Sequence, residues 1–217
     1  MRGVFITGTD TSIGKTVISA SIVQAFSPNS SYWKPIQTGW PDDDDLDFIR
    51  TMTALDPSRC IPNTYRLKEP ASPHYAARQE GTDISIENVL NAQTSLPKDS
   101  FYIIEGAGGL LVPLNEKELM VDLMARLKLP VVLVSSTGLG TINHTLLSLF
   151  YLEKRSIPTL GIITIGPPDP SMLSALAEHS TVPILAEIPQ VTHVNQKEIL
   201  SFAKNLQASK LAEMIPQ

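Results

Sequence analysis

Short apolar runs alternate with amphipathic segments along almost the whole chain, and this alternation most restricts the possible fold. Apolar runs of this length predict strands, and the helical patterns between them predict helices. The expected strands are 4–7, 32–38, 101–109, 130–136, 160–166 and 182–189. The expected helices are 16–26, 45–55, 84–96, 119–128, 142–154, 170–179 and 197–215. Repeated strand–helix units predict an α/β fold with a mostly parallel sheet flanked by helices on both faces.

Composition narrows the class of protein further. The 217 residues, 42% hydrophobic and 18% charged, show no shift in composition, so we expect one domain spanning 1–217. A net charge of −5 and the lack of basic runs argue against a nucleic-acid partner. No stretch approaches the roughly 18 apolar residues of a membrane helix, so we expect no membrane partner. Cys60 is alone, which favours a reducing cytoplasm.

The stretch GTDTSIGKT follows the first expected strand and opens the first expected helix. Small residues let backbone N–H groups approach phosphate oxygens, a lysine supplies charge, and a threonine hydroxyl can ligate Mg²⁺. The spacing departs from the standard phosphate loop, because Thr9 stands where the pattern has glycine and the glycine is Gly8. An ordinary turn capped by Thr11 or Ser12 is the alternative. The strand before and the helix after favour nucleotide binding.

Other chemical side chains follow the ends of later strands, where ligands gather in parallel sheets. Glu105 ends a buried strand before a glycine turn and could reach a metal–nucleotide. Lys34 could offset phosphoryl charge in the same cleft, although a surface lysine is the simpler interpretation. Within Asp42–Asp45 one carboxylate could complete a Mg²⁺ site, but the helix dipole alone also favours acidic residues there.

Taken together, these motifs resemble dethiobiotin synthetase. GTDTSIGKT, KPIQTG, ASPH, IEGAGGLLVPL, LGTINHTLL and AEIP arrive in that family's order and cover most of the chain. The combination is specific to the family, whereas GKT alone is not. The resemblance implies a P-loop NTPase-like three-layer sandwich and an ATP-dependent enzyme of biotin biosynthesis. Such an enzyme joins 7,8-diaminononanoate and CO₂ into the ureido ring of dethiobiotin, through a carbamate and a carbamic–phosphoric anhydride, and releases ADP and phosphate.

The resemblance also implies roles for individual residues. Lys34, Lys15 and Thr11 would be catalytic, and Thr16, Asp45 and Glu105 would surround Mg²⁺. The substrate would contact Thr11, Lys34, Thr38, Gly140, Thr141 and Asn143. The nucleotide would contact Ser12, Ile13, Gly14, Lys15, Thr16, Val17, Asp45, Glu105, Gly106, Ala107, Gly108, Ile188 and Pro189. The segment Leu139–Asn143 of the neighbouring subunit would present a helix N-terminus to the substrate carboxylate. This arrangement implies a homodimer with active sites at its interface.

One position departs from the family. Many members carry an asparagine after the sixth strand that reads the adenine edge, and Ile165 stands there. Isoleucine offers no hydrogen-bonding group, so we expect weak discrimination between nucleobases.

A competing hypothesis is a switch ATPase of the deviant phosphate-loop group, acting through nucleotide-dependent dimerisation. That group has a signature lysine where this chain has Asp10. The roles of Ser72, Pro73 and His74 and the fold of 57–81 are left open by the sequence.

Overall fold

A parallel sheet of seven strands forms the centre of the molecule. The computed structural model describes residues 1–26 and 29–215. The strand order is β4-β2-β6-β1-β7-β8-β9, and every neighbouring pair is parallel. The strands are β1 (Arg2–Gly8), β2 (Ser30–Trp33), β4 (Cys60–Ile61), β6 (Phe101–Gly109), β7 (Val131–Ser136), β8 (Thr159–Ile165) and β9 (Ile184–Ile188). Because β1 lies in the middle of this strand order, the loop that follows it lies at the middle of the sheet's carboxyl edge.

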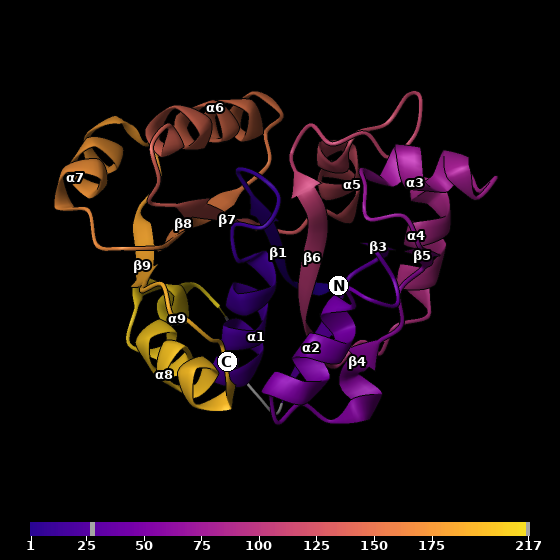
Figure 1. Ribbon diagram of the computed structural model, residues 1–217, viewed down its shortest axis with the longest axis horizontal. Helices are drawn as coiled ribbons and strands as arrows, with labels where there is room; N and C mark the ends of the chain where they lie inside the picture. Colours follow the sequence, from indigo (N-terminus) through magenta and orange to yellow (C-terminus); the bar gives the residue numbers. More distant parts are fainter. Residues whose placement is uncertain (27–28, 216–217) are drawn as a thin grey trace.

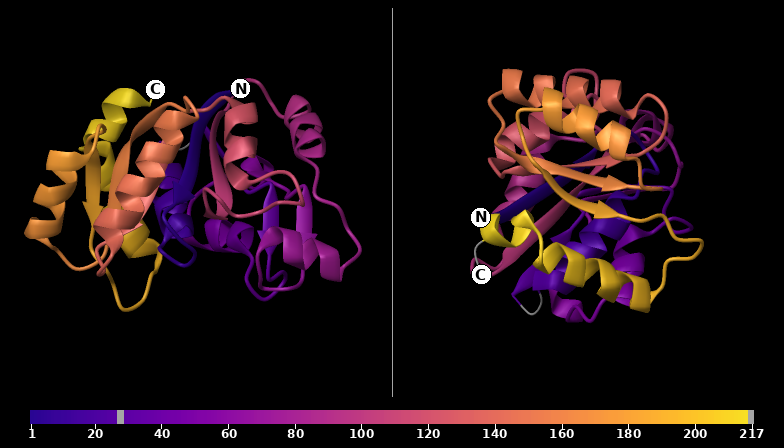
Figure 2. Two further views of the ribbon diagram at one scale, coloured as in Figure 1. Left: turned by 90° about the horizontal axis from the view of Figure 1, so that it is seen from above. Right: turned by 90° about the vertical axis from the view of Figure 1, so that its left-hand side faces the viewer.

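Helices cover both faces of this sheet, and the right-hand view of Figure 2 shows the three layers. One layer contains α1 (Lys15–Phe26), α2 (Asp45–Met52), α8 (Gln196–Gln207) and α9 (Lys210–Met214) (Figure 1). The opposite layer contains α4 (Ile86–Thr94), α5 (Met120–Leu127), α6 (Thr141–Lys154) and α7 (Pro170–His179). A separate hydrophobic core lies between the sheet and each layer. The expected α/β fold, with a parallel sheet between helical layers, is confirmed.

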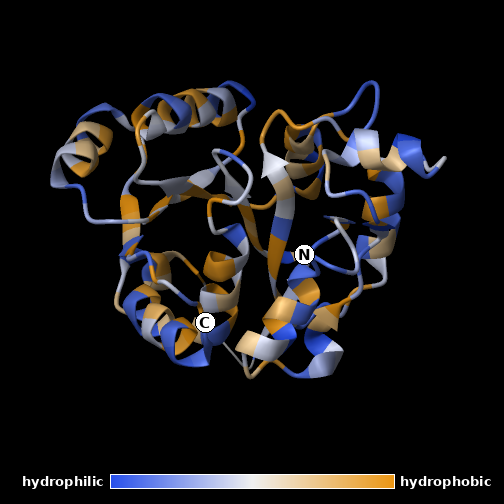
Figure 3. Ribbon diagram, viewed as in Figure 1, coloured by the Kyte–Doolittle hydropathy of each residue, from blue (hydrophilic) through white to orange (hydrophobic). Residues whose placement is uncertain are grey.

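The local sequence explains these elements. The expected strand over 130–136 is β7, whose Val131–Val134 are fully buried, because a parallel strand covered on both faces needs an unbroken apolar run. Helix α8 carries both hydrophobic and hydrophilic residues (Figure 3) and is amphipathic. Its buried residues include Ile199, Phe202 and Leu206, which are spaced so that they share one face. It begins at the Asn195 cap, whose side chain accepts hydrogen bonds from two backbone N–H groups of the first turn.

Two sequence predictions are wrong in detail. The strand expected over 32–38 ends at Trp33, and Ile36–Thr38 form β3 of a separate two-stranded sheet with β5 (Tyr65–Leu67). Pro35 separates the two pieces because it has no N–H to continue a ladder, and its carbonyl accepts N–H bonds from Thr64 and Tyr65. The terminal helix expected over 197–215 is two helices, α8 and α9, and Ser209 caps the second.

The segment 57–81, whose fold the sequence left open, runs along the edge of the main sheet. It contains a 3₁₀ turn (Pro57–Arg59), the edge strand β4, the strand β5 and the helix α3 (Pro73–Gln79). Strands of two and three residues are too short for a period-2 pattern to show in the sequence. This segment places Ser72 and His74 beside the loop that follows β6.

Candidate active site

The loop between β1 and α1 lies at the centre of the sheet's carboxyl edge. Gly14 has φ +95°, a backbone conformation that favours glycine, and a Cβ there would lie 2.7 Å from Cδ1 of Ile165, whose side chain would have to shift. Lys15, the first residue of α1, is largely buried, and its Nζ donates to the carbonyl of Asp10 at 2.7 Å. The loop therefore curls around its own lysine, with the start of α1 pointing at the enclosed space.

Thr16 joins two carboxylates that come from distant parts of the chain. Its Oγ1 lies 2.7 Å from Oδ1 of Asp45 at the start of α2, and 2.9 Å from Oε1 of Glu105 on β6. A hydroxyl has one hydrogen to donate, so it satisfies only one ionised carboxylate at a time. The hydroxyl oxygen and one oxygen of each carboxylate therefore lie close together, and the hydroxyl alone does not offset the negative charge of the two carboxylates.

Lys34 supplies that positive charge in this structure. Its Nζ forms an ion pair with Asp45 and lies 3.5 Å from Oε1 of Glu105. The lysine follows β2, which lies beside β6 in the sheet, and this neighbourhood brings the groups together. Lys34 and Lys15 line the same cavity, where the sequence placed both.

Burial and charge shift the ionisation of these groups. Burial raises the pKa of Glu105, and Lys34 offsets only part of that effect. Burial alone would raise the pKa of Asp45, but the adjacent Lys34, together with hydrogen bonds from Thr16 and Gln37, reverses this and lowers it. Burial alone would lower the pKa of Lys34, yet Glu105 and Asp45 together raise it. Burial lowers the pKa of Lys15, which Glu105 opposes. The two lysines and two carboxylates form one interacting set.

A cavity of about 290 Å³ opens onto this set. The predicted residues that line it are Thr11, Ser12, Gly14, Lys15, Thr16, Val17, Lys34, Thr38, Asp45, Glu105, Ala107 and Gly108. Gly106 lies in the core instead, where a Cβ would come within 2.9 Å of Phe5. Asp43, one of the four aspartates left open by the sequence, also lines the cavity, as does Gln37, which was not among the predicted site residues.

A second cavity of about 610 Å³ shares Ser12 and Gly14 with the first. Ile13 and Ile165 line it, together with Gln190 and the turn that leads into α7. Ile188 is buried in the core and Pro189 is not among the lining residues, so Gln190 is the residue of this segment that faces the cavity. Its place beside the loop suits the base and sugar of a nucleotide.

A third cavity of about 470 Å³ lies on the other side of the loop and shares Thr11 with the first. Its wall combines the 109–113 turn, Ser72, His74 and the outer face of α6. Gly140, Thr141 and Asn143 at the start of α6 line none of these cavities within the part of the chain that the structure describes. The Thr141 hydroxyl is buried against Ser135 Oγ at 2.7 Å.

The donor set fits a magnesium ion. Mg²⁺ prefers hard oxygen ligands, binds few protein carboxylates and keeps several waters or phosphate oxygens. Thr16, Asp45 and Glu105 offer three such oxygens around one point. In this structure the ammonium group of Lys34 offsets the charge of the two carboxylates. Across residues 1–26 and 29–215, no group of three or more His, Cys, Asp or Glu side chains is placed so that it could hold a metal ion by itself. A site of this kind would therefore depend on nucleotide phosphates for its remaining ligands.

The parallel sheet, the loop at its centre and the lysine–threonine pair at the helix start define the P-loop NTPase class. Solved structures confirm this fold at low sequence identity. A ParA family ATPase from Chlorobium tepidum superposes with TM-score 0.58 at 17% identity, covering 99% of this chain and 97% of that one. The MinC:MinD cell division complex of Aquifex aeolicus gives TM-score 0.59 at 14% identity, covering 100% of this chain and 98% of that one.

Residues 2–198 match the family described as AAA domain. The ATP-dependent dethiobiotin synthetase BioD of Paramagnetospirillum magneticum is 44% identical over 88% of this chain and 91% of its own length. The corresponding protein of Brucella ovis is 41% identical over 95% of both chains. The biotin biosynthesis bifunctional protein BioCD of Bordetella avium is 42% identical over 94% of this chain, which spans 43% of that longer protein. The chain belongs to the ATP-dependent dethiobiotin synthetase family.

Among the helices of residues 1–26 and 29–215, none has the length and apolar character needed to cross a membrane.

Proposed function

We propose that this chain, folded as one domain over 1–217, is a cytoplasmic ATP-dependent dethiobiotin synthetase. It would convert 7,8-diaminononanoate, CO₂ and ATP into dethiobiotin, ADP and phosphate. The observation that carries the proposal is the convergence of two lysines, two carboxylates and Thr16 on one cavity beside the phosphate loop. The family's relatives are named for this activity.

The chemistry needs three bond-forming steps. One amine nitrogen of the substrate attacks CO₂ and loses a proton, which gives a carbamate. A carbamate oxygen then attacks the γ-phosphorus of ATP, ADP leaves, and a carbamic–phosphoric anhydride forms. The second amine attacks the carbonyl carbon of this anhydride and loses a proton, phosphate leaves with the bonding electron pair, and the ring closes. Holding both amines beside the anhydride supplies most of the acceleration of the last step.

The two lysines would stabilise the charge that accumulates during phosphoryl transfer. A carbamate facing a triphosphate concentrates negative charge, and preorganised cations act strongly where water is excluded. Lys15, at the helix start, would hold the transferred phosphoryl group, and Lys34 would lie opposite, beside the carbamate. Thr11 and Thr38 line the same cavity and would contact the diamine or its carbamate.

Thr16, Asp45 and Glu105 would hold Mg²⁺, which when bound with nucleotide neutralises phosphate charge. For the nucleotide itself, Ser12–Val17 would surround the phosphates together with Glu105, Ala107 and Gly108. Ile165 and Gln190 would flank the base in the adjoining cavity. Ile188 and Pro189, also assigned to the nucleotide from the sequence, would act through the turn that positions Gln190.

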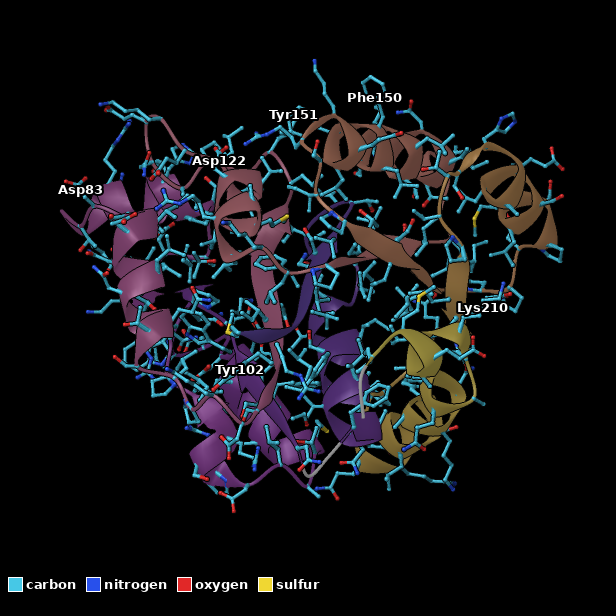
Figure 4. The ribbon with its side chains drawn as sticks, turned by 180° about the vertical axis from the view of Figure 1, so that it is seen from behind. Asp83, Tyr102, Asp122, Phe150, Tyr151 and Lys210 are labelled. Carbon is cyan, nitrogen blue, oxygen red and sulfur yellow. The ribbon has the colours of Figure 1, made fainter. Side chains whose placement is uncertain are left out.

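A homodimer would complete the substrate site. Leu111, Leu139, Leu147 and Phe150 are large exposed hydrophobic residues. Leu111 and Leu147 also line the cavity that leads from Thr11, and Phe150 lies on the outer side of α6 (Figure 4). A second copy packed on this face would bury these side chains around that cavity. Backbone N–H groups near Gly140, Thr141 and Asn143, at the start of its α6, would then receive the substrate carboxylate.

The test measures phosphate release with ATP and Mg²⁺, with and without the diamine and bicarbonate. Stimulation that requires both, together with dethiobiotin detected by mass spectrometry, supports the proposal. Phosphate release that ignores the diamine would contradict it and favour the switch ATPase. Lys34→Met should abolish dethiobiotin formation, whereas Lys154→Met, a matched change on the exposed end of α6, should leave it unchanged.

A further inference from the structure

Tyr32 is a buried polar residue that the chemistry described above does not use. It lies on β2, between β4 and β6, and pairs in register with Ile103, two residues before Glu105. Its side chain is fully buried, and its hydroxyl donates to Oε2 of Glu105 at 3.0 Å. From the sequence alone, Tyr32 is distinguished only by its place at the start of an expected strand.

The two oxygens of Glu105 have different partners. Oε1 faces the cavity, 2.9 Å from Thr16 Oγ1 and 3.5 Å from Lys34 Nζ. Oε2 accepts a hydrogen bond from the Tyr32 hydroxyl instead. Because the carboxylate is planar, a hydrogen bond that fixes Oε2 also fixes the direction of Oε1. The orientation of the face that Glu105 presents to the cavity is therefore set from the opposite side, within the sheet.

We infer that Tyr32 is a positioning residue that aims Oε1 of Glu105 at the divalent cation. The inference rests on the proposed function, in which Glu105 is a metal ligand. Carboxylate ligands are commonly held by a further hydrogen bond, and its removal typically weakens metal binding about 10–100-fold. A phenol suits this place because it donates one hydrogen bond and carries no charge. Burial and the neighbouring Glu105 raise the pKa of Tyr32 well above its ordinary value, so it remains a donor.

Tyr102 provides a matched control for the loss of one buried phenol hydroxyl. It lies on β6 (Figure 4), is 1% exposed, and its hydroxyl donates to the carbonyl of Pro97 at 2.7 Å. Tyr32→Phe and Tyr102→Phe therefore delete the same atom from two buried sites. Only the first deletion removes a bond to Glu105. A general effect on stability should appear in both variants, whereas an effect on the metal should appear only in Tyr32→Phe.

The experiment titrates the full-length protein with Mn²⁺ in the presence of ADP and follows the free-ion signal by electron paramagnetic resonance. We expect the Mn²⁺ dissociation constant to rise about tenfold or more in Tyr32→Phe and by less than about twofold in Tyr102→Phe. In steady-state assays the half-saturating Mg²⁺ concentration should rise by the same factor in Tyr32→Phe. Its kcat at saturating Mg²⁺ should stay near the wild-type value, because the tyrosine does not touch substrate.

Glu105→Gln separates failure of this inference from failure of the proposed site. If wild type binds Mn²⁺ and Glu105→Gln does not, the metal site stands, and equal affinities for the two phenylalanine variants would then overturn the role of Tyr32. If Glu105→Gln binds as wild type does, both ideas fall.

Should Tyr32→Phe not fold, the intact protein still gives an answer. With 3-fluorotyrosine at all five tyrosines, the Tyr32 fluorine resonance should move when Mg²⁺ joins ADP, while that of Tyr102 stays. An unmoved Tyr32 resonance would contradict the inference.

Discussion

Replacing Lys34 by methionine should destabilise the fold, because this lysine neutralises two buried carboxylates. Its side chain is 9% exposed, and those of Asp45 and Glu105 are 13% and 1% exposed. Methionine fills similar space without charge, so Asp45 and Glu105 would face one another around Thr16. Removing one partner of a buried pair costs about 3–5 kcal/mol. We expect the lower end, since one carboxyl can take up a proton instead of remaining charged.

A loss of about 3 kcal/mol lowers Tm by about 6–12 °C in a chain of this size. Thermal unfolding followed by circular dichroism, with EDTA at about pH 8, measures it. Lys154→Met, at an exposed position, should shift the free energy of unfolding by no more than about 0.5 kcal/mol. Added Mg²⁺ should then reduce the difference in Tm between wild type and Lys34→Met. At about 100 times its Kd, a ligand adds about 2.7 kcal/mol, and in the variant Mg²⁺ has no ammonium to displace.

The difference in stability between wild type and Lys34→Met should depend on pH, and the pKa of Glu105 sets the direction of that dependence. Burial raises the pKa of Glu105 above its ordinary 4.5 even beside Lys34, and without Lys34 it rises further. The cost of charged Glu105 in the variant is thus absent below about pH 4.5 and grows as pH rises to the raised folded-state pKa. The two proteins should differ less at about pH 5 than at about pH 8. A Tm within about 2 °C of wild type in EDTA, or equal stabilisation of both by Mg²⁺, would refute the reasoning.

Three further outcomes are expected. Thr16→Ala should raise the half-saturating Mg²⁺ concentration about tenfold by removing one of three converging oxygens, and an unchanged Mg²⁺ dependence would contradict its role. Wild type should use ATP, GTP and CTP with similar kcat/KM, and Ile165→Asn should favour ATP by about tenfold. A strict ATP preference in wild type would refute this. Phe150→Glu should yield monomers in sedimentation velocity and reduce kcat/KM for the diamine more than for ATP, and an unchanged sedimentation coefficient would exclude α6 from the dimer interface.

The sequence was most informative where one local pattern decides the structure. The loop before Lys15 and the strand that ends at Glu105 both combine an apolar run with a glycine turn, and both lie where expected. Long-range packing decided the rest. Pro35 diverts the chain into a second sheet whose partner, β5, is about thirty residues away and too short to show periodicity. For the site, strand order brings Lys34 beside Glu105, but no pattern in the sequence states which strands are neighbours.

The four aspartates Asp42–Asp45 show the same difference between what a local pattern predicts and what packing decides. Asp42–Asp45 are indistinguishable by composition, and the resemblance alone singled out Asp45. In the structure Asp44 caps α2 by accepting from the N–H of Leu46, which is the role that the helix dipole favours. The next residue, one step along the first turn, turns its carboxylate to Thr16. In the proposed site, capping and metal binding would thus be divided between adjacent residues.

Charge balance links the fold of this site to its proposed chemistry. Lys15 and Lys34 match Asp45 and Glu105 one for one, and Asp43, the third carboxylate that lines the cavity, is exposed to solvent, so the buried charges nearly cancel. A nucleotide entering alone would bring several negative charges next to two carboxylates, at a cost that burial amplifies. A nucleotide entering with Mg²⁺ would disturb the balance less, because Thr16, Asp45 and Glu105 would hold the cation and Lys34 would then be free to face phosphate and carbamate. The same two carboxylates that hold the lysine in place would in this way release it only when the complete metal–nucleotide arrives.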